Sequence, residues 1–250
     1  MVIFLPVQDT HEETSMPLRS RLSFWFCSAC CLTLLAFGSG CNILGAAAQV
    51  LPQPDILPAY KGLSGQTVGV MVWVDRGVRI DYPALQGDVG RGLTAKLSQI
   101  TNPKDPKELE KVPPEMAHIQ YLNPMSIIRF QEDHPELEGL PSTDIAKRLG
   151  VTRVIYLEVY SFETRPHESI DLFKGTLLSK LEVLEVSSGL DGAKTARVAY
   201  SDSDLRSVYP ANRPEGIAGT DVSPEYIYRK TVDQFTADVA IKFVTHPSEK

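Results

Sequence analysis

The side chains best suited to chemistry in this chain are histidines with carboxylates beside them. The densest cluster is Asp133-His134, with Glu132 before it and Glu136 after it. Such a group has the composition of a general acid–base or metal site. The cluster stands around Pro135, at the predicted end of a helix, and a solvated helix end is the simpler interpretation.

The other histidines and serines do not form catalytic patterns. Beyond the first forty residues, the spacings HExxH and H-x-H occur at none of His118, His167 and His246. Neither Ser126 nor Ser179 lies in a G-x-S-x-G or S-x-x-K pattern. Gly87, Gly90 and Gly92 depart from the G-x-G-x-x-G order and fall within a predicted helix. We therefore expect no enzyme activity, no cofactor and no metal.

Two exposed connections carry residues suited to binding a protein. A Pro/Gly-rich loop over 208–222 contains Tyr209 and Arg213, and aromatic residues and arginine are enriched at interaction hot spots. The charged, proline-broken segment 101–117 is the second candidate. For both, a plain solvent-exposed connection is the alternative.

Cys41 is a candidate for covalent modification. It follows the small residues 38–40 and an uncharged apolar stretch over 22–37, and Arg19 and Arg21 precede that stretch. This order is that of a secretory signal peptide, and the stretch is short for a bilayer span. It resembles the signal of bacterial lipoproteins, although that family usually has Leu, Val or Ile where Gly38 stands. The resemblance implies cleavage before Cys41 and acylation of its thiol with fatty acids such as palmitate; ordinary signal cleavage and an uncleaved anchor stay open.

The surroundings of Cys41 refine this interpretation. Residues 1–15 carry three acidic side chains, whereas Met16 begins a compact signal, so we predict Met16 as the true start. The cysteines all lie at or before the cleavage point: Cys27, Cys30, Cys31 and Cys41. The body beyond has no thiol for a disulfide, a zinc site or a nucleophile. Asn42 resembles the residue of lipoproteins sent to the outer membrane, rather than the Asp that favours inner-membrane retention.

The charge balance limits the partners. The chain has 25 basic and 31 acidic residues, a net charge of −6, and the part after the signal stays near −5. We therefore expect no nucleic acid and no anionic lipid surface as partner. Because no later apolar run reaches spanning length, the expected membrane contact is the lipid on Cys41.

The remaining pattern predicts one α/β domain over 67–245, after a signal over 1–40 and a flexible Ala/Pro/Gln-rich linker over 41–66, and before a tail over 246–250. The continuous apolar run 67–74 predicts a central strand buried on both faces. An amphipathic helix follows, starting at Asp81 and Pro83, with its apolar stripe formed by Leu85, Val89, Leu93, Leu97 and Ile100.

Further elements complete the domain. They are a helix from Asn123-Pro124 to Pro135, a helix ending at Gly150, a strand over 151–162, a hairpin of strands 173–186 and 195–201, and a terminal helix from Ser223. Strand, helices and strand in this order predict a parallel crossover. The fold class is therefore α/β, with a mixed sheet of a parallel crossover plus an antiparallel hairpin, packed by helices.

This order of elements behind a lipidated cysteine resembles a group of envelope domains. They are the outer-membrane lipoprotein activators of penicillin-binding proteins, the curli-secretion channel subunit, and the amino-terminal domain of the Tol-system propeller protein. The likeness is carried by the strand 68–74 with its helix, by 145–150 leading into 154–159, and by the hairpin 175–201. Unlike the channel subunit, the chain has no pair of long alternating segments suited to a transmembrane hairpin.

From these features we expect a lipid-anchored envelope protein that acts as a non-enzymatic interaction, assembly or regulatory subunit. Its expected partners are the membrane, through Cys41, and an unidentified envelope protein. Two alternatives stay open: an oligomeric component of an envelope export machine, and a hydrolase or small-ligand binder that uses Asp133 and His134.

Overall fold

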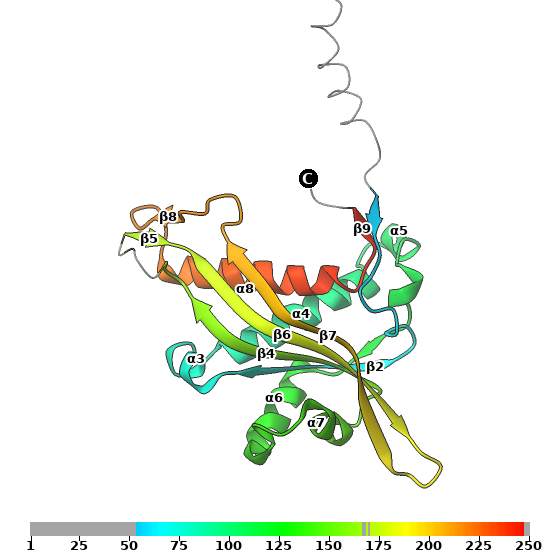
Figure 1. Ribbon diagram of the computed structural model, residues 1–250. Helices are drawn as coiled ribbons and strands as arrows, with labels where there is room; N and C mark the ends of the chain where they lie inside the picture. The colour runs from blue at the N-terminus through cyan, green and yellow to red at the C-terminus, as the bar shows by residue number, and fades with distance from the viewer. Residues whose placement is uncertain (1–53, 167–168, 170, 248–250) are drawn as a thin grey trace, which may run out of the picture. The chain divides into compact units, whose positions relative to one another are not determined.

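The computed structural model describes residues 54–166, 169 and 171–247 (Figure 1). Cys41, the predicted signal and His167 lie outside the described residues. None of the described helices combines the length and the low polarity needed to cross a membrane.

A mixed five-stranded sheet organises the domain, in the order β3-β2-β4-β6-β7. Its strands are β2 (Thr67–Val74), β3 (Gln120–Tyr121), β4 (Arg153–Glu163), β6 (Gly175–Ser188) and β7 (Lys194–Tyr209). β2 is parallel to both β3 and β4, whereas β4, β6 and β7 are antiparallel neighbours. The predicted fold class, a parallel crossover plus an antiparallel hairpin, is confirmed.

Helices cover both faces of the sheet (Figure 1). The long helices α4 (Leu85–Thr101) and α8 (Pro224–Ile241) pack on one face. The shorter helices α6 (Pro124–Asp133) and α7 (Ser142–Leu149) pack on the other. The domain therefore has two cores, one on each side of the sheet.

The central strand β2 shows why its sequence is continuously apolar. Val70, Val72 and Val74 point into the core beneath α4 and α8, while Met71 and Trp73 point into the core beneath α6 and α7. A strand that is covered on both faces has no solvent-exposed face, so its sequence does not alternate between apolar and polar residues. The predicted central strand is confirmed.

Capping residues set the ends of three helices as predicted, whereas the predicted helix start at Asp81 and Pro83 is wrong, because Asp81 ends a separate short helix and α4 begins at Leu85 without a side-chain cap. The Asn123 side chain accepts a hydrogen bond from Met125 N at 2.9 Å, and Ser223 Oγ accepts one from Tyr226 N at 3.1 Å. Gly150 ends α7 with φ of 77°, the left-handed conformation that glycine adopts most readily. One short helix was not predicted, α3 (Arg76–Asp81), which begins at a cap where Asp75 Oδ1 accepts from Gly77 N at 2.8 Å.

The domain extends beyond the predicted range 67–245. β1 (Asp55–Ile56) pairs antiparallel with β9 (His246–Pro247), which lie side by side in Figure 1. Leu63 is fully buried in the core under α4 and α8. The lack of periodicity in 54–66 predicts a linker, and this part of the prediction is wrong. The segment packs on the domain through individual residues such as Leu63, and isolated contacts of this kind leave no periodic pattern in the sequence.

The predicted hairpin is longer than expected. The second strand is expected to end at residue 201, but β7 continues to Tyr209. It contains two irregularities, each with one extra β7 residue, opposite residues 179–181 and 183–184 of β6. Its polar run Ser201-Asp202-Ser203-Asp204 reads as a loop, but β7 is the edge strand and its residues are largely exposed. Beside the hairpin, β5 (Leu172–Phe173) pairs with β8 (Ile217–Ala218).

The predicted excursion 101–117 contains two short helical turns. These are α5 (Pro106–Leu109) and the 3-10 helix η1 (Pro114–Met116). Met116 is buried in the core under α4 and α8, so the excursion is fixed to the domain at its end. A second 3-10 helix, η2 (Pro135–Leu137), joins α6 to the segment before α7.

Candidate functional site

The structure separates the two residues of the predicted interface loop. Tyr209 is the last residue of β7, and its hydroxyl lies 3.2 Å from the hydroxyl of Tyr226 on α8. Arg213 stands on an exposed turn closed by a hydrogen bond from Gly216 N to Arg213 O, 3.0 Å long. Among the described contacts, none joins Tyr209 to Arg213, and the pair does not form one site.

The predicted acid–base cluster is a solvated helix end. His134 Nδ1 lies 3.0 Å from Glu136 Oε1, and both side chains are about half exposed. Hydrogen bonds from the backbone and from His134 hold the pKa of Glu136 below its usual value. Asp133 and Glu132 are exposed beside them. In the described part of the chain, no three His, Cys, Asp or Glu side chains are placed to hold a metal ion.

Hollows occur instead where the parallel strands end. β2 lies between β3 and β4 in the sheet. The connection after β2 leads to α4 on one face, and the connection after β3 leads to α6 on the other. A crevice forms at the carboxyl ends of parallel strands where connections part in this way, and it is the usual ligand position in open α/β sheets.

The first hollow, of about 530 Å³, lies between the first turn of α4 and α6, with Gln86, Arg91 and Met125 in its lining. Gln131, also in the lining, donates from Nε2 to Val72 O at 2.8 Å. β3 pairs with β2 only at residues 67 and 68, so the rest of that edge of β2 is open. The amide of Gln131 bonds to this open part of the edge. Gly87, expected well inside a helix, lies in the first turn of α4 because the helix begins at Leu85.

The second hollow, of about 400 Å³, lies on the sheet face that α6 and α7 leave uncovered. Trp73 on β2, Glu158 on β4 and Lys180 on β6 are register neighbours across it. Glu182, only 6% exposed, is held by Lys180 Nζ at 2.7 Å and by Ser142 Oγ at 2.6 Å.

The aromatic ring of Tyr156 forms part of the floor of the second hollow. Burial, with smaller contributions from Glu158 and Glu182, raises the pKa of its hydroxyl well above the usual value. Tyr156 is therefore neutral at physiological pH and does not add a negative charge to the hollow.

Trp73 and Glu138 line both hollows. Trp73 is 8% exposed, and its Nε1 is buried without a hydrogen-bond partner among the described residues. Glu138 is exposed and receives hydrogen bonds from Arg79 Nη2 at 2.9 and 3.2 Å. Trp73 is thus a rigid, buried aromatic residue between two hollows, with a donor that no described side chain or backbone atom satisfies.

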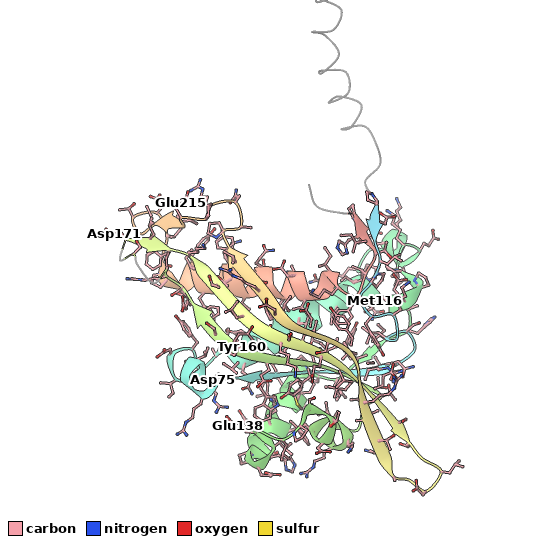
Figure 2. All side chains as sticks on the ribbon, in the orientation of Figure 1. Asp75, Met116, Glu138, Tyr160, Asp171 and Glu215 are labelled. Carbon is pink, nitrogen blue, oxygen red and sulfur yellow. The ribbon has the colours of Figure 1, made fainter. Side chains whose placement is uncertain are left out.

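Apolar side chains are exposed around these hollows. Met125, Leu140 and Tyr160 are 44%, 37% and 43% exposed. Figure 2 shows Asp75, Tyr160 and Glu138 at the same end of the sheet. Exposed apolar side chains beside a concave surface are typical of sites that bind another protein. We call this region the carboxyl-edge surface, defined by Trp73, Glu138, Leu140, Glu158 and Tyr160.

A signal for this surface is present in the sequence. Trp73 stands near the end of one predicted strand and Tyr160 near the end of another, and the two strands are expected to be parallel. Parallel strands place their carboxyl ends along one edge, so the residues there were candidates for a common site.

Comparisons with known proteins give no assignment. No family model and no curated protein matches the chain. A hypothetical protein from Chlamydia trachomatis is 11% identical, with 72% of this chain and 98% of that chain covered and a TM-score of 0.37. A lipoprotein from Neisseria meningitidis is 9% identical, with 70% and 98% covered and a TM-score of 0.33. A PelC dodecamer from Paraburkholderia phytofirmans is 8% identical, with 74% and 96% covered and a TM-score of 0.32. TM-scores this low identify neither a fold family nor a function.

Proposed function

We propose that this protein is a lipid-anchored envelope protein that binds a protein partner through the carboxyl-edge surface, as a non-enzymatic assembly or regulatory subunit. The observation that carries the proposal is the exposure of Leu140 and Tyr160 beside the buried Trp73. A large buried aromatic residue bordered by exposed apolar side chains and a charged rim has the composition of an interaction hot spot.

The charged groups of the site support binding rather than catalysis. Glu182 is neutralised by Lys180, and Glu138 is paired with Arg79. Neither hollow contains a histidine or a cysteine. The predicted acid–base pair, Asp133 and His134, lies outside the lining of both hollows.

The proposed anchor is the acylated thiol of Cys41, and it supplies the membrane contact without a basic surface. Each buried methylene of an acyl chain contributes about 0.8 kcal/mol, so two or more chains hold a domain at a bilayer. Replacing Cys41 by Ser should move the protein from the membrane fraction to the soluble fraction of the envelope. Retention of the Cys41→Ser protein in washed membranes would contradict this part of the proposal.

Site-specific photo-crosslinking tests the partner site. A benzophenone amino acid placed at Tyr160 or Leu140 should give one reproducible crosslinked product in intact cells, identified by mass spectrometry. The matched control is the same probe at Glu110, an exposed position next to α5. The proposal fails if positions 160 and 110 give the same products, or if neither position gives one.

A further inference from the structure

We infer that the second hollow of the carboxyl-edge surface receives a basic side chain, lysine or arginine, from an extended segment of the partner. This inference rests on the proposed function and specifies the chemistry of the partner. Its basis is the combination of unpaired carboxylates, aromatic rings and one unsatisfied donor in a single concave site.

The charge of the hollow is negative. Its lining contains four acidic residues and two basic residues: Asp75, Glu138, Glu158, Glu182, Arg76 and Lys180. The ion pairs of Glu182 with Lys180 and of Glu138 with Arg79 account for two of the carboxylates. Among the described residues, Glu158 has no ion-pair partner, and Asp75 uses one oxygen to cap α3. With these pairs counted, the two carboxylates and Arg76 leave the lining with one net negative charge, so the site favours an incoming cation.

Aromatic rings line the same hollow. Tyr156 and Trp73 are 7% and 8% exposed and form its inner part, while Tyr160 is 43% exposed at its rim. The face of an aromatic ring attracts an ammonium or guanidinium group, and the attraction is stronger where water is excluded. Rings and carboxylates together therefore suit the apolar stem and the charged head of lysine or arginine.

Trp73 lines both hollows, and its indole N–H has no acceptor among the described residues, so a ligand that brings an acceptor would satisfy it. Trp73 Nε1 is a donor only, and buried donors are almost always paired. A backbone carbonyl next to the basic side chain is such an acceptor. Because Nε1 is buried, an acceptor reaches it only if the side chains that cover it shift.

The shape of the site favours an extended segment over a helix. The hollow holds about 400 Å³, near the lower limit for ligand pockets and sufficient for one or two side chains. It lies over the end of β2 and the middle of β4 and β6, beside the first residue of α7. A segment crossing this surface can place alternate side chains toward and away from it.

A peptide titration tests the inference. The sequence has two tryptophans, and Trp25 lies in the predicted signal, so a Trp25→Phe background makes Trp73 the sole indole reporter whether or not the signal is removed. The probe is an acetylated, amidated pentapeptide of alternating leucine and arginine, added to the full chain in detergent micelles. We expect saturable shifts of the Trp73 fluorescence and of its indole N–H resonance, weaker at high salt. Glutamine or glutamate in place of arginine should abolish them.

Charge variants give opposite signs. Asp75→Asn keeps an oxygen for the α3 cap and removes the charge, and together with Glu158→Gln it should weaken binding about tenfold. Arg76→Gln removes the competing cation and should tighten binding about twofold to threefold. The control, Glu110→Gln, should change nothing.

Several results would overturn the inference. These are equal binding of the glutamine peptide, an unchanged affinity of the Asp75→Asn and Glu158→Gln double variant, and no response of Trp73 to the arginine peptide. If crosslinks from Tyr160 persist unchanged in that double variant, the proposed partner binding is supported, but the inference that the partner inserts a basic side chain is wrong. If no crosslinks form but the arginine peptide still binds specifically, the proposal of a protein partner is contradicted, and the hollow is a site for free cationic ligands.

Discussion

The hydroxyl of Tyr60 donates a 2.8 Å hydrogen bond to Glu185 Oε1, joining the segment before the sheet to the strand β6. Arg153 on β4 supports the pair, donating from Nε to the Tyr60 hydroxyl at 2.8 Å and to Gly62 O at 3.0 Å. Burial and the contact with Glu185 raise the pKa of Tyr60 to about 12. The segment 54–66 is therefore attached to the sheet by a specific polar contact as well as by the buried Leu63.

Removing that hydroxyl should destabilise the domain. Tyr60→Phe removes the hydrogen bond that Glu185 accepts from Tyr60, and we expect a loss of about 1–2 kcal/mol in the free energy of unfolding. Urea denaturation followed by circular dichroism measures it. The control is Tyr226→Phe, whose hydroxyl is exposed on α8 and should contribute no more than a few tenths of a kcal/mol. Equal effects of the two substitutions would contradict the proposed attachment.

The same contact predicts a pH dependence. The hydrogen bond from Tyr60, with Arg153 and Arg197 nearby, holds the pKa of Glu185 below its ordinary value of 4.5. A carboxyl group with a lowered pKa in the folded state stabilises the fold above its unfolded pKa and stops doing so as pH falls through the folded pKa. Denaturation from about pH 7 to pH 3 should therefore show a loss below about pH 4.5 that is smaller in Glu185→Gln. Superimposable profiles would show that this group does not contribute.

A glycine in β6 cannot accept a side chain. A Cβ on Gly175 would overlap Thr231 Oγ1 of α8, and Thr231 is fully buried with its hydroxyl donating to Ile227 O at 2.7 Å. We expect Gly175→Ala to cost about 3 kcal/mol or to prevent folding. Gly90→Ala in α4 is the matched control: its Cβ meets Val72 at an ordinary 3.7 Å, so it should stabilise by about 0.5–1 kcal/mol. Thermal denaturation distinguishes the two signs.

The side chain of Gln131 substitutes for a missing strand. Gln131→Met keeps a similar volume but leaves the buried carbonyl of Val72 without the amide donor, at an expected cost of about 1–3 kcal/mol. Glu132→Gln, at the exposed neighbouring position, should be neutral. Hydrogen exchange offers a second measurement, because amides near the end of β2 should lose protection in Gln131→Met alone. Identical stability of the two variants would show that the carbonyl is satisfied in another way.

Elements with strong local signals were predictable from the sequence. A continuous apolar run located β2, and apolar periodicity located α4 and α8. The caps Asn123, Ser223 and Gly150 located the ends of three helices. These signals act within a few residues and depend little on the rest of the fold. Val154 and Tyr156 also alternate with Ile155 and Leu157 along the sequence, and the structure places the two pairs in opposite cores.

Elements whose structure depends on distant partners were not predictable in the same way. The polar residues of β7 after Tyr200 are a strand because β6 pairs with them, although their composition is that of a loop. The segment 54–66 is ordered through contacts with β4 and β6, far along the chain. The carboxyl-edge surface required both the sheet order and the shortness of α7, neither of which is a local property of the sequence.

The pairing of β1 with β9 means that the path of the described chain nearly closes on itself. Because the two ends of the described chain lie together, its segments can be joined in a different order and still form the same fold. A permuted chain, joined from Pro247 to Asp55 by a short linker and opened in the exposed turn 189–193, would keep every strand pairing of the sheet. Its new ends would lie at the tip of the hairpin, so the same domain could be attached to a surface from a different direction.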